Sequence, residues 1–209
     1  DAGVDKTSIG LFAAVATPYA LKFLWAPVID ACGFPILSPW LGRRRGWILA
    51  TQIALVVSII MLGFADPSQN PWDTAILALI VAICSASQDI VIDAYRVEIL
   101  TAEQQKVGAG MVQFGYRFGM LASGAGALAL ADHMSWQQTY FIMAALLAFC
   151  ILPILFLPEP DASKEIGKFS ARHLLRDYVV APFTDFMTRS NWILLLLFIM
   201  LYKLGDAFL

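Results

Sequence analysis

Charged side chains interrupt a stretch of the sequence that is otherwise apolar enough to cross a membrane. The stretch is Thr74–Val97, and a helical span needs about 20 mostly apolar residues. A charge at the centre of a bilayer costs roughly 2.5–3.5 kcal/mol, so such residues are kept where water, an opposite charge or a ligand meets them. One helical stripe carries the polar residues Ser85, Gln88, Asp89, Asp93 and Arg96. This stripe predicts a helix that lines a polar cavity.

Two carboxylates of the stripe, Asp89 and Asp93, lie four residues apart and therefore close together on one helix face. Like charges in a medium of low dielectric constant disfavour double ionisation, so one carboxylate can carry a proton through a transport cycle. Asp89 is the stronger candidate for proton coupling because it lies deeper in the predicted span. Arg96 opposes this effect, and the alternative interpretation is a structural network of fixed charges.

Two further apolar segments carry ionisable residues. Lys22 has Tyr19 about one turn before it and Trp25 about one turn after it, and it either lines the cavity or extends to the membrane surface. Lys203 and Asp206 lie three residues apart on one helix face and can satisfy each other. Their depth favours a polar pathway, which makes Asp206 a third candidate for proton coupling.

The segment Val107–Ala131 has a small-residue face and a polar face. The small residues, which repeat every four positions and predict close approach of another helix, are Gly115, Gly119, Ser123 and Ala127. Gln113, Tyr116 and Arg117 lie almost opposite them. Arg117 is near mid-membrane depth at a rise of 1.5 Å per residue. It either pairs with an aspartate of a neighbouring helix or holds an anionic group of a substrate.

The composition is typical of a helical membrane protein, because 59% of the residues are hydrophobic, 14% are charged and the mean hydropathy is +0.71. The predicted spans are roughly Ser8–Ile29, Trp47–Ala65, Thr74–Val97, Val107–Ala131, Thr139–Leu157 and the segment from Trp192 onward. Most Lys and Arg residues lie in alternate connections, which predicts that this side is cytoplasmic and that Asp1 is outside. An outside start and an apolar end lead us to expect part of a longer protein, with at least one helix before Asp1.

The connection before the last span, Pro158–Asn191, is long. From Phe169 to Met187 apolar residues recur at helical spacing with cations between them. This pattern predicts an amphipathic segment on the inner membrane surface, bent at Pro182. It is either a tether between two halves or a regulatory element. Six helices, a long inner loop and further helices form the layout of a two-half transporter.

A basic run between Gly42 and Gly46 follows Asp30. In isolation such a run is a topology signal or a contact for lipid headgroups. Together with Asp30 it resembles, in stretched form, the loop signature between helices 2 and 3 of the major facilitator superfamily. The gating charge network that this resemblance implies consists of Asp30, Arg43, Arg44, Arg45 and Arg96. The insertion Ala31–Leu41 and the absence of the usual glycine before the Asp depart from the signature.

Five blocks of the sequence closely resemble the AmpG family of muropeptide permeases. They are Leu21–Pro27, Gly42–Trp47, Ser85–Ala94, Gly115–Met120 and Tyr202–Phe208, in order over nearly the whole chain. That family also carries the stretched loop. The related acetyl-CoA transporters of eukaryotic internal membranes look similar around Gln88 and Asp89 but match the other blocks less well.

The resemblance implies an all-α membrane protein with a helical bundle like that of the major facilitator superfamily, of which the chain covers about helices 2–7. Residues 1–157 would form most of the N-terminal half, residues 158–190 a cytoplasmic linker, and residues 191–209 the start of helix 7. The implied function is proton-coupled import of anhydromuropeptides across the bacterial inner membrane for peptidoglycan recycling. The alternatives are a transporter of another anionic metabolite such as acetyl-CoA, or a membrane-embedded enzyme or receptor.

The expected partners are an anionic glycopeptide substrate, protons and the lipid bilayer, with no cofactor, metal or nucleic acid, and the expected state is a monomer. Cations would meet the carboxylates of the substrate, amides and hydroxyls would meet its polar groups, and aromatic rings would stack on its sugars. The candidate side chains are Tyr19, Lys22, Trp25, Gln88, Gln113, Tyr116, Arg117 and Lys203.

Overall fold

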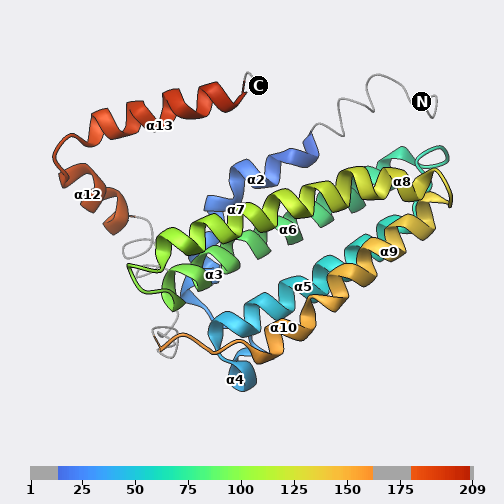
Figure 1. Cartoon of the computed structure of the whole chain (residues 1–209), viewed down its shortest axis with the longest axis horizontal. Helices are drawn as coiled ribbons and strands as arrows, with labels where there is room; N and C mark the ends of the chain where they lie inside the picture. The colour runs from blue at the N-terminus through green and yellow to red at the C-terminus, as the bar shows by residue number, and fades with distance from the viewer. Residues whose placement is uncertain (1–13, 162–179, 208–209) are drawn as a thin grey trace. The chain divides into compact units, whose positions relative to one another are not determined.

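The computed structural model describes residues 14–161 and 180–207, with side chains described as far as Leu201. The chain divides into two units, Asp1–Gly167 and Lys168–Leu209, which are described separately below. All regular elements in the described ranges are helical (Figure 1). The predicted fold class, a helical membrane bundle, agrees with this architecture.

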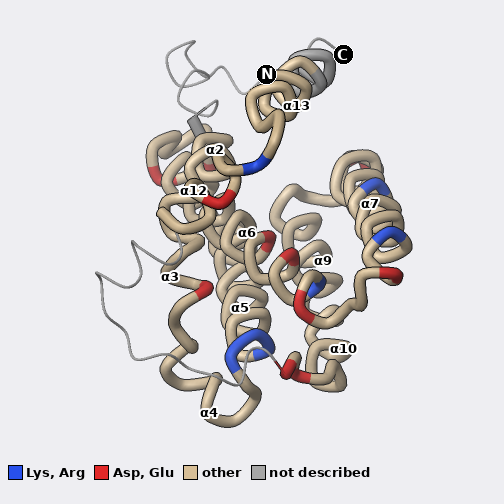
Figure 2. Tube along the Cα trace, turned by 90° about the vertical axis from the view of Figure 1, so that its left-hand side faces the viewer, with Lys and Arg blue, Asp and Glu red and all other residues tan. Residues whose placement is uncertain are grey.

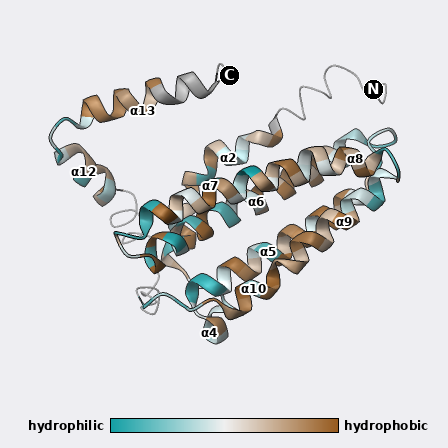
Figure 3. Cartoon of the chain, in the orientation of Figure 1, coloured by the Kyte–Doolittle hydropathy of each residue, from teal (hydrophilic) through white to brown (hydrophobic). Residues whose placement is uncertain are grey.

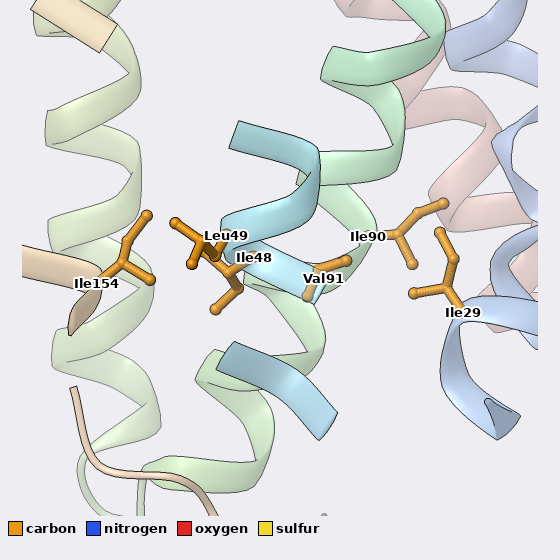
Figure 4. Packing of buried hydrophobic residues seen from close by; sticks show 6 residues of the cluster. All are labelled: Ile29, Ile48, Leu49, Ile90, Val91 and Ile154. Atoms are coloured by element: carbon orange, nitrogen blue, oxygen red, sulfur yellow. The ribbon is translucent and has the colours of Figure 1, made fainter. Parts of the chain in front are cut away.

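Three long helical elements form the body of the first unit. They are α5 (Arg43–Gly63), α6 (Pro71–Ile99) and α9 (Trp136–Phe149), which α10 (Ile151–Phe156) extends. Helix α5 makes its most extensive contacts with α6 and α9. Side chains from these elements and from the N-terminal helices form one buried cluster, in which Leu49 faces Ile154 and Ile90 faces Ile29 (Figure 4).

The predicted first span, Ser8–Ile29, is not a continuous helix where the structure describes it. It consists of η1 (Ala14–Ala16), α2 (Thr17–Leu21), η2 (Lys22–Leu24) and α3 (Ala26–Ala31). Two prolines, Pro18 and Pro27, lie in the first turns of α2 and α3. Proline has no backbone N–H and starts helices more readily than it continues them, so each proline begins a new short segment.

The insertion that stretches the basic loop is folded against the beginning of α5. It contains the short helix α4 (Ser38–Leu41). The indole of Trp47 donates a hydrogen bond to the carbonyl of Cys32 at 2.7 Å and stacks edge-on against Phe34, with ring centroids 5.2 Å apart. The extra residues therefore support the helix that carries the arginines.

The predicted span Val107–Ala131 is helical throughout but interrupted. It comprises α7 (Gln105–Leu121), the π-helical turn η3 (Ala122–Gly126) and α8 (Ala127–Ala131). Most of its side chains are exposed and none is buried, and α7 stands apart from α5 and α9 in Figure 2. Nothing in the described structure lies within 4 Å of a Cβ built on Gly115 or Gly119. The helix expected against this small-residue face is therefore not among the described residues.

In the second unit, α12 (Ala181–Thr188) and α13 (Trp192–Ala207) meet at an angle of 104°. Asn191, with φ of 64°, lies between them. Pro182 lies in the first turn of α12, and the part of the predicted amphipathic segment before Val180 lies outside the described residues. The side chains of Lys203 and Asp206 also lie outside the described set.

Three helical elements of the described chain are long and apolar enough to cross a membrane: Arg43–Gly63, Pro71–Ile99 and Trp136–Phe156. A fourth is counted if α12 and α13 are taken as one bent span. Apolar residues dominate the middle of these helices, and hydrophilic residues gather at their ends (Figure 3). This distribution is the one expected of helices whose middles contact lipid and whose ends contact water.

Candidate functional site

Polar contacts connect the N-terminal helices to the polar stripe of α6. The hydroxyl of Tyr19 donates to Ser85 Oγ at 2.7 Å, and the indole of Trp25 donates to Ser87 Oγ at 3.1 Å. Between these two contacts a salt bridge joins Lys22 on η2 to α6. Three residues from three consecutive turns of the N-terminal segment thus meet α6 through side-chain polar groups.

The salt bridge of Lys22 is made with Asp89, at 3.5 Å from Nζ to Oδ2. The two side chains are 36% and 53% exposed, so the pair is open on one side. Asp93, one turn along, is 57% exposed and lies 3.6 Å from Arg96. These charges are therefore partly exposed and do not form a dry pair sealed inside the described bundle.

A pocket of about 510 Å³ lies beside this surface. Its lining residues are Lys22, Phe23, Ala26, Asp30, Arg44, Ile90, Asp93, Ala94, Val97 and Glu98. The pocket combines cations, carboxylates and apolar walls. It therefore brings together predicted proton-coupling, substrate-binding and gating residues.

At one end of the pocket lies a buried charge cluster, formed by Asp30, Arg43, Arg44 and Glu98. Arg44 Nη1 is 2.8 Å from Asp30 Oδ1, and its Nε lies 3.0 Å from each oxygen of Glu98. Arg43 Nη2 lies 3.4 Å from Glu98, and its Nη1 donates to the carbonyl of Asp30. The arginine side chains are only 9% and 5% exposed, so the carboxylates are what allow these charges to stay buried.

A third carboxylate, that of Glu159, lies at the N-terminus of α5. It accepts hydrogen bonds from the backbone N–H groups of Arg44 at 2.9 Å and Arg45 at 3.1 Å. The first N–H groups of a helix have no partner within the helix, and the helix dipole favours an anion there. The side chain of Arg45 donates to the carbonyl of Leu155 at 2.6 Å, so the end of α10 is held against the start of α5 by two kinds of contact.

Gly42, directly before α5, provides the space for this arrangement. Its φ of 92° is one that side-chain-bearing residues rarely adopt, and a Cβ there would collide with the carboxyl group of Glu159. We expect Gly42→Ala to lower the free energy of unfolding by about 1–3 kcal/mol. Gly110→Ala is the matched control, because nothing lies within 4 Å of its Cβ position in α7. Denaturation of the purified full-length protein tests this, and equal losses in both variants would contradict the assignment.

The structure separates some predicted site residues from the others. Gln88 donates to the buried amide of Gln52 on α5, so it points away from the side on which Asp89 meets Lys22. Gln52 in turn donates to the carbonyl of Leu147 on α9 at 2.6 Å, which makes it a polar link across three helices.

The remaining predicted residues fall into three groups. Gln113, Tyr116 and Arg117 are exposed on α7 and line none of the pockets described here. Arg96 has Asp93 as its ion-pair partner and does not join the acids of the buried cluster. Lys203 and Asp206 have no described side chains.

Two acids of the site, Glu98 and Glu159, are absent from the sequence predictions. Glu98 lies two residues after Arg96, at the predicted cytoplasmic end of its span. The basic run Arg43–Arg45 is predicted on the same side, so Glu98 could have been predicted as a partner of these arginines. Glu159 lies in the predicted linker, where nothing in the pattern separates it from neighbouring polar residues. Among the described residues no group of His, Cys, Asp and Glu side chains is arranged to hold a metal ion. The site offers cations and carboxylates beside one another, a chemistry suited to binding charged groups.

Comparisons with known proteins agree with this description. A family model described as Major Facilitator Superfamily matches residues 1–209. The chain is 48% identical to the anhydromuropeptide permease of Escherichia coli (strain K12), over 98% of this chain and 40% of that protein. It is 32% identical to putative transporter AmpG 4 of Rickettsia felis, over all of this chain and 51% of that protein. The chain therefore spans about two fifths to one half of the length of these relatives.

Proposed function

The chain belongs to the Major Facilitator Superfamily and resembles the AmpG family within it, and from this premise we propose that the protein is a proton-coupled importer. Its proposed substrates are anhydromuropeptides, and their import is driven by the proton gradient. The observation that carries the proposal is the pair of Lys22 and Asp89. Both residues belong to largely apolar segments, yet Lys22 lines the pocket and its partner Asp89 is 53% exposed. Ionisable groups inside a membrane protein mark a polar route for a solute or a proton.

The substrate is proposed from the printed name of the Escherichia coli relative, an anhydromuropeptide permease. Such a substrate has peptide carboxylates, amides and sugar hydroxyls. In the proposed complex Lys22 meets a carboxylate, while Arg117 and Lys203 provide further cations from other helices. Gln113 and Tyr116, exposed on α7, supply hydrogen bonds from the face of that helix.

In the proposed cycle, Asp89 exchanges its proton when the substrate competes for Lys22, and Asp93 and Asp206 are secondary proton sites. The buried cluster of Asp30, Arg43, Arg44 and Glu98 acts as the gate, because its contacts join three helical segments that must separate when the protein changes conformation. A charge network that breaks and forms again is suited to a two-state transition.

The wider layout is proposed on the same basis. Residues 1–157 form most of an N-terminal half, residues 158–190 a cytoplasmic linker, and residues 191–209 the start of a C-terminal half. The protein lies in the bacterial inner membrane with the arginine cluster on the cytoplasmic side, in accord with the positive-inside rule, and functions as a monomer.

Uptake of labelled anhydromuropeptide into vesicles that contain the full-length protein tests the proposal. We expect accumulation above the external concentration when the proton gradient is imposed, and equilibration without it. Competition by acetyl-CoA but not by unlabelled muropeptide would assign a different anionic substrate. Chemical conversion of the label without translocation would contradict a transport function.

A further inference from the structure

A second cavity lies at the end of the first unit opposite the arginine cluster, where α5 ends and α6 and α9 begin. Its volume is about 680 Å³, within the range of small-molecule sites. Its walls include three aromatic rings, Phe64, Trp136 and Tyr140, and the carboxylate of Asp66. None of the described residues that line it is Lys or Arg. The cavity thus has aromatic faces and a negative charge.

An apolar groove lies between α5 and α9, farther from the end of α5 and the start of α9 than the cavity is. It has a volume of about 320 Å³ and is lined by Val56, Ile60, Phe141, Ala144, Ala145 and Ala148. The small alanine side chains of α9 leave this space open beside α5. No polar side chain lines the groove, so its surface matches a hydrocarbon chain in chemistry.

The linings of the cavity and the groove are in contact. Phe64 of the cavity and Phe141 of the groove stack edge-to-face, with ring centroids 5.1 Å apart. On α9, Tyr140 of the cavity lies one helical turn from Ala144 of the groove. The polar cavity and the apolar groove therefore follow one another along the interface between α5 and α9, which we call the α5–α9 seam.

The cavity lies at the level of the membrane that lipid headgroups occupy. Trp72 and Trp136, near the starts of α6 and α9, are 63% and 57% exposed. Exposed tryptophans at the ends of spanning helices lie at the membrane–water interface. From the cavity, its aromatic belt and the groove below, we propose that the α5–α9 seam binds a phospholipid whose headgroup ends in an ammonium, with one acyl chain in the groove.

The negative charge of Asp66 in the cavity determines which headgroup the site prefers. Asp66 accepts hydrogen bonds from the N–H and hydroxyl of Ser68 and from the amide of Gln69, and among described residues it has no cationic partner. The hydrogen bond from the Ser68 side chain is the main cause that lowers the pKa of Asp66, so the carboxylate is ionised at neutral pH. An ammonium is attracted to the carboxylate and to the aromatic faces, whereas an anionic headgroup is repelled.

Native mass spectrometry of the full-length protein, titrated with phosphatidylethanolamine or phosphatidylglycerol, tests this site. We expect one phosphatidylethanolamine to bind about tenfold more tightly than phosphatidylglycerol. Asp66→Asn should bring the two affinities close together, whereas the control Asp73→Asn, at the same end of the bundle but outside the cavity, should keep the difference.

The groove is tested by filling it. Ala145 is exposed, so Ala145→Phe is expected to fold normally and to lower the affinity for phosphatidylethanolamine at least tenfold. Leu146→Phe, one position along and outside the groove, should bind as the unchanged protein does. Equal affinities for the two lipids in the unchanged protein, or a preference that survives both Asp66→Asn and Ala145→Phe, would overturn the proposal.

Discussion

Replacing Glu98 by glutamine is expected to lower the free energy of unfolding by about 3–5 kcal/mol. Glu98 is the shared partner of Arg43 and Arg44, whose side chains are almost fully buried. Removing one acid leaves two guanidinium groups in a region of low dielectric constant with only the groups of Asp30 to compensate them. A buried charge without its partner costs far more than an exposed one, because it has lost its hydration.

Unfolding of the purified full-length protein in denaturant measures this loss. Glu103→Gln is the matched control, because it removes the same charge from an exposed position in the connection just after α6, and its effect should stay within about 0.5 kcal/mol. Arg44→Lys should fall between the two, since lysine keeps the charge but cannot contact both oxygens of Glu98 from a planar group. A similar loss in the Glu98 and Glu103 variants would show that the cluster is not what holds these helices together.

Replacing Asp89 by asparagine is expected to abolish concentrative uptake while leaving the fold nearly unchanged. The salt bridge with Lys22 is open to solvent, and exposed pairs contribute about 0–1 kcal/mol to stability. The energy that Asp89 would couple to transport is larger than this contribution to stability. Each net charge that enters down a potential of 100 mV provides roughly 2.3 kcal/mol, which supports a gradient of about 50-fold.

Vesicle uptake and substrate exchange together distinguish coupling from binding. The Asp89→Asn protein should still exchange labelled for unlabelled substrate across the membrane but should no longer accumulate it when the membrane is energised. Asp132→Asn, in an exposed connection after α8, is the control and should accumulate substrate normally. Full accumulation by the Asp89 variant would exclude this residue as the coupling site.

The long spans of the first unit are predictable from the sequence because apolar length is a property of the segment itself. The predicted spans Trp47–Ala65, Thr74–Val97 and Thr139–Leu157 correspond to α5, α6 and α9 with α10, with ends that differ by a few residues. The predicted first span differs most, since a hydropathy pattern does not register that Pro18 and Pro27 each begin a new helical segment.

The polar stripe of α6 shows that the sequence does not specify which side chains contact one another. The helical period places Gln88 and Asp89 near one another, but the packing gives them different neighbours, Gln52 on α5 and Lys22 on η2. Similarly, the arginines of the basic loop are evident in the sequence, whereas their acidic partners Glu98 and Glu159 come from positions 54 and 115 residues away from Arg44.

The sequence by itself determined that this is a helical membrane protein of the Major Facilitator Superfamily that resembles the AmpG family, with charged residues along the apolar segment that forms α6. Composition, helical period and shared sequence blocks are sufficient for these conclusions because they depend on the order of residues along the chain. Only the tertiary structure decided which charges pair, which remain open to the pocket, and that the α5–α9 seam contains a second cavity. Those features depend on how separate helices pack, and the period of a single helix fixes the direction of a side chain without fixing what it meets.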